Sequence, residues 1–237
     1  QLLKDTPLDR SQRFYVDTIA SSGKSLLTVI NDILDYARIE SGKLSLEQIE
    51  FDLEQLISET TNLFTAQALE KRLRLYVCLE AGVPQYIIGD PIRIKQVLMN
   101  LLSNAIKFTA EGYVSLNIQR RDNQQGQAQL LFSIRDGGIG ISPEGQALLF
   151  KSFAQGDSSM TRRYGGSGLG LAISKELVTM MNGDIALQSN LSQGSVFTFD
   201  LPLQQNPERD DSLTRLLNGR TALLTSLDGQ GLDVLEL

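Results

Sequence analysis

The chain has 237 residues, 41% of them hydrophobic, and its formal net charge is −6. This length and composition fit a globular protein with one core and a helical extension, and the negative charge argues against binding nucleic acid through a basic surface. With one cysteine and no histidine, the chain cannot form an internal disulfide and is a poor candidate for a zinc site. No apolar run reaches the roughly 18 residues of a membrane span. Because the chain opens in a helix-like segment and stops abruptly, we expect it to be a piece of a longer protein.

Residues 12–46 are predicted to form one long helix, with Ser41-Gly42 as a plausible stop. Apolar residues recur at spacings of three and four and form a stripe of Ile19, Leu26, Val29, Ile30, Ile33, Leu34, Tyr36 and Ala37. Such a long stripe needs a partner, and we expect antiparallel pairing within a dimeric helical bundle. Packing of the helix on its own domain is the alternative. Residues 5–9 are predicted to be the turn after an earlier helix that ends with residues 1–4.

Residues 50–203 are predicted to form one α+β domain, a two-layer sandwich of helices against a mixed, largely antiparallel sheet. From the apolar spacing, the expected helices cover residues 53–71, 91–108 and 169–181, and the expected strands cover 73–80, 113–121, 128–136, 184–190 and 195–203. Asp90 is predicted to cap the second helix, with Pro91 at its first position. Residues 204–218 are predicted to form a polar linker, and Thr221–Thr225 is predicted to be a short strand that opens a further unit at 219–237.

Polar side chains share one face of the helix that starts at Pro91. Arg93, Gln96, Asn100, Asn104 and Lys107 follow one another at spacings of three and four, and leucines lie largely away from that face. An amide oxygen is a ligand that Mg²⁺ accepts, so Asn100 is a candidate metal ligand, with Asn104 and Lys107 facing phosphates. A solvated helix face explains this motif equally well when it is taken alone.

Asp136 ends a predicted strand and is followed by a glycine-rich turn, residues 137–140. A carboxylate at a strand end can accept a hydrogen bond from an exocyclic amine such as that of adenine. The glycines let the backbone come close to a purine. Taken alone, this motif is better explained as an ordinary Asp-Gly turn.

A second glycine-rich segment, residues 165–170, runs directly into a predicted helix. Backbone amides and the positive end of a helix dipole bind phosphate at such a junction. The polar loop between the two glycine segments carries the neighbours Arg162 and Arg163, which suits a mobile lid whose cations reach phosphate when it closes. For Phe150 and Phe153, the simpler interpretation is that they anchor this loop in the core.

In this order and spacing, the motifs resemble those of the ATP-binding domain of sensor histidine kinases, within the wider superfamily of gyrase, chaperone and mismatch-repair ATPases. The matching segments are the asparagine box at 90–109, the phenylalanine box at 150–155 and the glycine boxes at 136–141 and 166–171. Residues 12–46 resemble the second helix of the family's dimerisation domain. The resemblance implies a Bergerat-type ATP-binding fold over residues 50–203, preceded at 1–46 by a partial dimerisation and phosphotransfer region.

The resemblance also implies roles for individual residues. Asn100 would bind Mg²⁺, and Asn104 and Lys107 would contact phosphates together with the lid arginines. Asp136 would read adenine, helped by Ser195 through water. The full set implied to bind ATP is Asn100, Asn104, Lys107, Phe108, Asp136, Gly138, Gly140, Phe153, Arg162, Arg163, Tyr164, Gly166, Ser167, Gly168, Leu169, Gly170 and Ser195.

Three positions depart from the patterns of related proteins. Asn100 stands where related hydrolases carry a water-activating glutamate, which fits a kinase that keeps ATP for transfer. Gly137 and Ser167 stand where threonine is usual, and we expect both to be tolerated because the carboxylate and the backbone amides remain.

The implied function is that of the catalytic region of a bacterial hybrid sensor histidine kinase, which binds Mg-ATP and transfers the γ-phosphoryl group to a histidine. Since this chain has no histidine, we expect the acceptor to lie on the first dimerisation helix, outside these residues, and we expect the fragment not to phosphorylate itself. The implied partners are a second copy, through the helical bundle, and a receiver domain or response regulator. Residues 219–237 resemble the first strand of a receiver that is degenerate at Ser226 and Leu227. The region would be the cytoplasmic portion of an inner-membrane sensor.

A different class of function stays open. The chain could be a regulatory module that pairs with another sensor kinase and modulates its phosphorylation. Three features are compatible with this regulatory role: Gly137, the degenerate start of the receiver and the bundle helix. An ATP-hydrolysing clamp protein is disfavoured by Asn100 and by the bundle helix.

Overall fold

The computed structural model describes residues 3, 6–150, 168–205 and 222–224. In chain order, its helices and strands are α1 (Arg10–Glu40), β1 (Ile49–Asp52), α2 (Leu53–Glu70), β2 (Arg74–Leu79), β3 (Tyr86–Gly89), α3 (Pro91–Phe108), β4 (Tyr113–Asp122), β5 (Ala128–Asp136), α4 (Pro143–Gln146), α6 (Gly170–Met180), β6 (Ile185–Asn190), β7 (Gly194–Pro202) and β8 (Ala222–Leu224). Among the described helices, none combines the length and the apolar character needed to cross a membrane.

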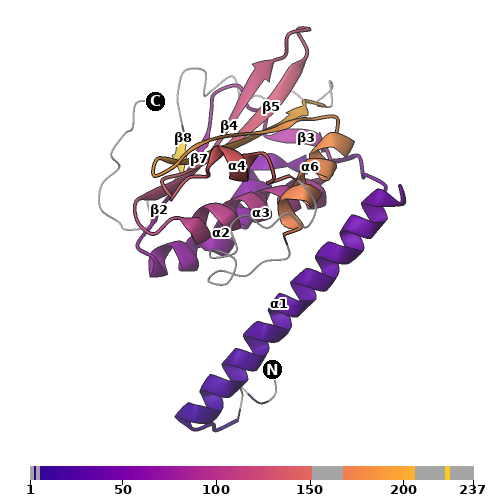
Figure 1. Ribbon diagram of the computed structural model, residues 1–237. Helices are drawn as coiled ribbons and strands as arrows, with labels where there is room; N and C mark the ends of the chain where they lie inside the picture. Colours follow the sequence, from indigo (N-terminus) through magenta and orange to yellow (C-terminus); the bar gives the residue numbers. More distant parts are fainter. Residues whose placement is uncertain (1–2, 4–5, 151–167, 206–221, 225–237) are drawn as a thin grey trace.

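The domain after α1 has two layers, a sheet and a set of helices (Figure 1). The strand order of the main sheet is β6-β7-β5-β4-β2-β8, and its neighbouring strands are antiparallel except for the parallel pair β2 and β4. The helix α3 lies between α2 and α6 and packs on β4 and β5. A separate antiparallel pair is formed by β1 and β3. The predicted two-layer α+β sandwich is thereby confirmed.

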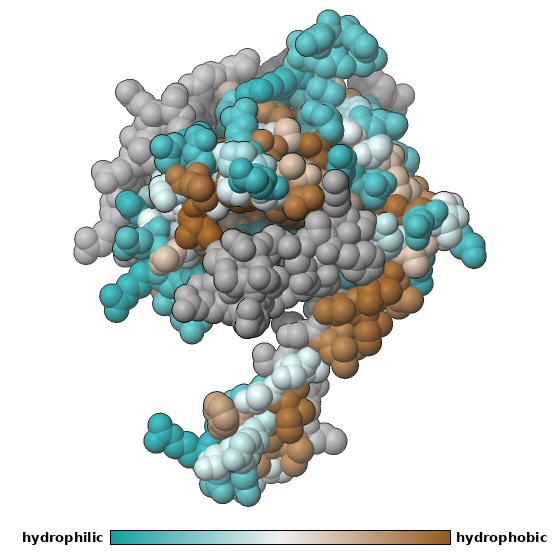
Figure 2. All heavy atoms as spheres, viewed as in Figure 1, coloured by the Kyte–Doolittle hydropathy of each residue, from teal (hydrophilic) through white to brown (hydrophobic). Residues whose placement is uncertain are grey.

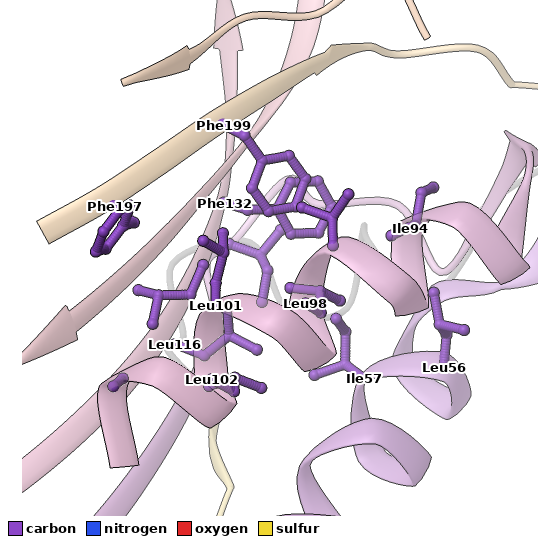
Figure 3. Close-up of a cluster of buried hydrophobic side chains, with 14 of the residues drawn as sticks. Leu56, Ile57, Ile94, Leu98, Leu101, Leu102, Leu116, Phe132, Phe197 and Phe199 are labelled. Atoms are coloured by element: carbon purple, nitrogen blue, oxygen red, sulfur yellow. The ribbon is translucent and has the colours of Figure 1, made fainter. Parts of the chain in front are cut away.

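The core lies between α3 and the sheet. Alternate residues of β4 point into it, as period-two burial requires. Figure 3 shows Leu98 and Leu101 of α3 beside Phe132 and Phe199, whose rings stack with centroids 4.5 Å apart. All four side chains are at most 1% exposed. Each buried side chain of this size contributes roughly 1.5–3 kcal/mol, so this layer holds α3 firmly on the sheet.

The start of α3 is fixed by one buried carboxylate. As predicted, Asp90 is the N-cap, and its Oδ1 accepts hydrogen bonds from the amides of Ile92 and Arg93 at 3.1 and 3.0 Å. Its Oδ2 accepts a further hydrogen bond from the amide of Glu47, at 3.1 Å. The same side chain therefore ties the segment that follows α1 to the first turn of α3.

The helix α1 begins and ends at local signals. Asp9 and Gln12 form a reciprocal capping box at its start, with hydrogen bonds of 2.8 and 3.0 Å. The predicted stop is confirmed, because the helix ends before Gly42, which has a φ of +64°. The predicted range of 12–46 was wrong at its end: Leu44 and Leu46 continue the apolar spacing, but they pack against the domain core instead.

Most of the apolar face of α1 is exposed in the single chain. The exposed fractions of Phe14, Ile19 and Leu26 are 66%, 71% and 60%. Figure 1 shows α1 extending away from the domain, and Figure 2 shows apolar side chains along the extended part. Its C-terminal end reaches the domain, where Tyr36 and Ile39 pack against the core. Packing on its own domain therefore accounts for the last turns of α1 and leaves most of its apolar face uncovered.

The other predicted elements that the structure describes lie within two residues of their observed bounds. Within the described residues, the short elements β1, β3 and α4 were not predicted. Residues 222–224 of the predicted strand at 221–225 form β8, which pairs antiparallel with β2. The assignment of 219–237 to a receiver domain stays a prediction. Residues 206–218 of the predicted linker lie outside the described residues. So does the predicted earlier helix at 1–4, apart from Leu3.

Candidate functional site

The polar residues of α3 share one face of the helix, as their spacing predicts. Asn100, Asn104 and Lys107 are all partly buried, whereas Leu101 and Leu102 on the other side of the helix are fully buried. The apolar side therefore holds the helix, and the polar side is left to bind other groups. The roles of the three polar residues stay predictions.

The amide group of Asn100 is held by groups from α6 and from its own helix. Its Nδ2 donates to the hydroxyl of Ser174 at 2.8 Å, and its Oδ1 accepts a long hydrogen bond of 3.5 Å from Nδ2 of Asn104. A β-carbon at Gly170 would collide with Oδ1 of Asn100. The start of α6 can therefore lie directly on the Asn100 amide only because residue 170 has no side chain.

The N-terminus of α6 is the candidate phosphate site. Gly168 has a φ of +70°, and Leu169 is the N-cap residue, without a side-chain hydrogen bond at the cap. The first amides of a helix have no partner within the helix, so they and the helix dipole favour an anion at this end. Six predicted site residues lie outside the described residues: Phe153, Arg162, Arg163, Tyr164, Gly166 and Ser167.

The C-terminal end of α3 is fixed by a lysine that the sequence analysis missed. The ammonium group of Lys71 donates to the carbonyl oxygens of Ile106, Lys107 and Thr109 at 2.8, 3.0 and 3.3 Å. A cation at this end also complements the helix dipole. Because Lys71 lies 35 or more positions before its acceptors, no local pattern could reveal it. The contact holds the last turn of α3, which carries Lys107.

Lys107 itself sits in a partly desolvated position. Burial lowers the pKa of its ammonium group below the ordinary value of 10.5. Its Nζ lies 5.0 Å from the centre of the Phe108 ring, a cation–π contact. An ammonium group at this position can offer a positive charge to a phosphate.

Asp136 is a buried carboxyl at the end of β5. It stands opposite Val114 on one side and Ser195 on the other, and it is 6% exposed. Burial raises its pKa, and hydrogen bonds from the Gly138 amide and from the backbone and hydroxyl of Ser195 partly offset that rise. The predicted water between Ser195 and Asp136 is untested, but the two residues are direct neighbours in the sheet.

The glycines after Asp136 are required by close backbone contacts. A β-carbon at Gly138 would lie 2.6 Å from the carbonyl oxygen of Phe108, and one at Gly140, whose φ is +68°, would overlap the carbonyl of Asn190. The turn therefore lies against the end of α3. Gly137 is different, since a β-carbon there would be 3.8 Å from the nearest atom. Residue 137 therefore has room for a side chain, so close contacts do not require glycine there.

Ser189 of β6 supports the same turn and was also missed. Its hydroxyl accepts from the amide of Ile141 at 2.9 Å, donates to the carbonyl of Gly194 at 2.9 Å and lies 3.0 Å from the hydroxyl of Ser195. The side chain of Gln146 donates to the carbonyls of Ile141 and Ser189. A serine in an alternating strand carries no sequence signal for this role.

The described parts of the three motifs thus meet at one edge of the domain. Asn100 contacts Gly170, and Phe108 at the end of the same helix contacts Gly138 beside Asp136. The arrangement offers an amide oxygen, a lysine, a helix N-terminus and a buried carboxyl. An amide oxygen is a ligand type that Mg²⁺ accepts, and helix amides and lysine suit phosphates, so the residues present fit a metal–nucleotide.

A polar cluster joins the end of α1 to α3. The side chain of Gln96 donates to Oδ2 of Asp35 at 2.9 Å, and Arg93 lies 3.7 Å from the same oxygen. Arg93 also donates to Oε1 of Gln96 at 2.8 Å. These three residues, the Asp35 cluster, extend the polar face of α3 toward α1. The sequence pattern placed Arg93 and Gln96 on that face but did not reveal their partner.

Two protein families match this chain. Residues 89–205 match the family described as "Histidine kinase-, DNA gyrase B-, and HSP90-like ATPase". This range includes Asn100, Asp136 and Gly170 of the candidate site. Residues 1–42 match the "His Kinase A (phospho-acceptor) domain", which covers α1. Residues 43–88, which include β1, α2 and β2, lie outside both matched ranges.

Curated proteins with similar sequences are sensor kinases. The signal transduction histidine-protein kinase BarA of Escherichia coli K12 is 41% identical over 87% of this chain, and the sensor protein GacS of Pseudomonas syringae is 41% identical over 96%. The autoinducer 2 sensor kinase/phosphatase LuxQ of Vibrio cholerae is 40% identical over 92%. The chain spans only 22–25% of the length of these relatives.

Two solved structures are similar to this chain over most of its length. Full-length ShkA in complex with AMPPNP matches with a TM-score of 0.72 and 33% identity, over 86% of this chain and 42% of that one. The Acinetobacter baumannii histidine kinase AdeS matches in fold, with a TM-score of 0.64 and 21% identity, over 86% of this chain and 90% of that one.

Proposed function

Because this chain belongs to the histidine kinase family and carries its ATP-binding domain, we propose that it is the catalytic region of a hybrid sensor kinase of two-component signalling. In this proposal it binds Mg-ATP between α3 and α6 and transfers the γ-phosphoryl group to a histidine outside these 237 residues. The observation that carries the proposal is the contact of Gly170 with Asn100. It brings a candidate metal ligand directly against a candidate phosphate site.

The proposed division of labour follows from the chemistry of each group. Asn100 ligates Mg²⁺ through Oδ1, and the amides at the start of α6 and Lys107 bind phosphate oxygens. Asp136 accepts a hydrogen bond from the amine of adenine. A Mg²⁺ ion held by Asn100 would supply positive charge to offset the charge that develops on the phosphates. Related hydrolases carry a glutamate at the position of Asn100, and that carboxylate activates the attacking water. An asparagine amide cannot act as this base, so ATP is kept for transfer to the histidine.

The transfer itself needs a second helix. The bond between the γ-phosphorus and its bridging oxygen breaks, ADP leaves, and a bond forms between phosphorus and an imidazole nitrogen. We place that imidazole on the partner helix of α1 in a bundle formed by two copies of the parent protein. The exposed fractions of Ile19 and Leu26 on α1, 71% and 60%, support such a bundle. A receiver domain or response regulator would then take the phosphoryl group.

The location and the alternative function are also proposals. We place this region on the cytoplasmic side of an inner-membrane sensor, where ATP is available. The exposed face of α1 equally suits pairing with the helices of another sensor kinase, in which case the chain would modulate that kinase. Absence of Mg-dependent nucleotide binding at millimolar concentration would favour this regulatory role.

Two measurements test the kinase proposal. Calorimetric titration with Mg²⁺ and AMPPNP should give one site per chain. Incubation with ATP labelled at the γ-phosphate should leave this chain unlabelled, while the full-length parent protein becomes labelled at a histidine. Stable label on this chain would contradict the placement of the acceptor outside it, and an unlabelled parent protein would contradict the kinase activity.

A further inference from the structure

The side chain of Asn100 can serve a cation in only one of its two orientations. Its Oδ1 is an acceptor and can ligate a metal, whereas its Nδ2 is a donor and repels one. The two orientations differ by a half-turn of the amide and have almost the same shape. A site that depends on Asn100 therefore needs another group that distinguishes its oxygen from its nitrogen.

Ser174 holds the nitrogen end of this amide in the structure. It is 2% exposed, lies one turn after Gly170 on α6, and its hydroxyl accepts a hydrogen bond from Nδ2 of Asn100 at 2.8 Å. Because Gly170 has no side chain, the amide of Asn100 lies directly on α6 and can reach this buried hydroxyl.

Asn104 contacts the oxygen end of the same amide. Its Nδ2 points at Oδ1 of Asn100 from 3.5 Å. If the Asn100 amide were turned over, every hydrogen bond would be kept only if the Asn104 amide also turned over and the Ser174 hydroxyl became the donor; otherwise one donor would lose its acceptor. Ser174 and Asn104 therefore bind the two ends of the same amide, and together they favour one orientation.

We propose that Ser174 is a positioning residue: its hydroxyl holds the Asn100 amide so that Oδ1 is the atom presented to the metal of bound Mg-nucleotide. The inference rests on the proposed function and adds a residue to it. Ser174 does not contact the metal or the nucleotide in this proposal. It lowers the cost of binding by fixing the metal's ligand beforehand.

The test compares nucleotide affinity with and without the metal. The Kd of AMPPNP is measured by calorimetry in excess Mg²⁺ and again in EDTA, and the ratio of the two affinities reports the contribution of the metal. For Ser174→Ala we expect this ratio to fall about threefold to tenfold, the size of one lost buried hydrogen bond. The affinity in EDTA should stay within about twofold of the original value.

Three further variants separate orientation from general damage. Ser174→Cys has nearly the original volume but a weaker acceptor, so its ratio should also fall. Thr60→Val removes a different buried hydroxyl, which bonds to the carbonyl of Leu56 within α2, and it should leave the ratio unchanged. In an Asn100→Asp background, both ends of the side chain are oxygens, so adding Ser174→Ala should no longer reduce the ratio.

The outcomes distinguish this inference from the proposed function. If Asn100→Ala leaves the ratio unchanged, the metal site itself is misplaced and the proposed function fails. If Asn100→Ala lowers the ratio but Ser174→Ala does not, only the positioning role is wrong. A drop of the same size for Ser174→Ala in the wild-type and the Asn100→Asp backgrounds would also overturn that role, because orientation could not then be the cause.

Discussion

The helices α1 and α3 are both amphipathic, yet they bury their apolar faces to opposite extents. Leu98 and Leu101 of α3 are completely buried against the sheet of their own domain, whereas Ile19 and Leu26 of α1 are 71% and 60% exposed. Apolar spacing therefore predicts that a helix has a partner surface but not which molecule supplies it. The two-layer domain buries its core within one chain, whereas α1 buries only the end of its apolar face there.

The polar faces of the two helices differ as well. On α3 the polar residues line the candidate site, from Asn100 to Lys107. On α1 most polar residues face solvent, and Asp35 is an exception because it binds Gln96 of α3. The Asp35 cluster is thus a point at which the exposed helix and the buried helix meet.

The largest expected effect is on the buried face of α3. Leu101→Ala should lower the free energy of unfolding of the domain by about 2–5 kcal/mol, because it removes a buried side chain and leaves a cavity. Leu26→Ala on α1 is the matched control and should change it by less than about 0.5 kcal/mol. Urea unfolding of dilute protein measures both. Equal losses would mean that α1 is also part of the stable unit of a single chain.

The next effect concerns the polar face of α3. Asn100→Ala should weaken binding of AMPPNP in excess Mg²⁺ by about 10–100-fold, since it removes the proposed metal ligand. Asn31→Ala removes an exposed asparagine of α1 and should have no effect. Calorimetry gives both affinities. A loss that persists unchanged in EDTA would mean that Asn100 contacts the nucleotide and not the metal.

The pH dependence tests the buried carboxyl at the end of β5. Because burial raises the pKa of Asp136 above 3.8, this group favours the folded state below pH 3.8, and that contribution is lost as the pH rises through the raised value. Adenine binding has the opposite sign, because the charged form is the better acceptor. Lowering the pH from about 7 through the raised pKa should therefore weaken adenosine binding about fivefold.

Adenosine is the suitable probe because it has no phosphate that titrates in this range. Asp136→Asn should bind adenosine weakly at every pH and show a flat profile. A wild-type profile that is equally flat would contradict the role of Asp136 in reading adenine.

The smallest expected effect is at the Asp35 cluster. A double-mutant cycle with Asp35→Ala and Gln96→Ala should give a coupling of about 0.5–1.5 kcal/mol, as for one partly buried hydrogen bond to a charged group. Hydrogen exchange of the last turns of α1 reports it, since loss of the cluster should loosen them. Glu40→Ala, an exposed acid on the same helix, is the control. No coupling would mean that Tyr36 and Ile39 alone hold α1 on the domain.

Local signals explain why most of the fold was predictable. The cap at Asp90, the proline after it and the helical spacing defined α3, and the alternation of apolar and polar residues defined the first half of β4. The strands β1 and β3 have only four residues each, and the pairing of Ile49 with Gly89 joins positions far apart in the chain. Such short strands exist because of their partner, so no window of sequence contains enough information to predict them.

Only part of the candidate site could be predicted from the sequence. Residues that line a helix face or form a glycine-rich turn leave a spacing pattern, and the resemblance of these patterns to the histidine kinase motifs is what pointed to Asn100, Gly138 and Gly170. Lys71, Ser174 and Ser189 act through partners on other elements. Their residue types are common in such positions for many reasons, so only the three-dimensional contacts reveal them.

The pairing of β8 with β2 has a consequence for solubility. A strand at the border of a sheet presents unpaired backbone groups that can recruit another chain and start aggregation. Residues 222–224 cover three positions of that border, Val77, Cys78 and Leu79. A shortened protein that stops at residue 205 would lose this cover and expose the border strand β2. It should therefore aggregate more readily than the longer chain, in which residues 222–224 protect that strand.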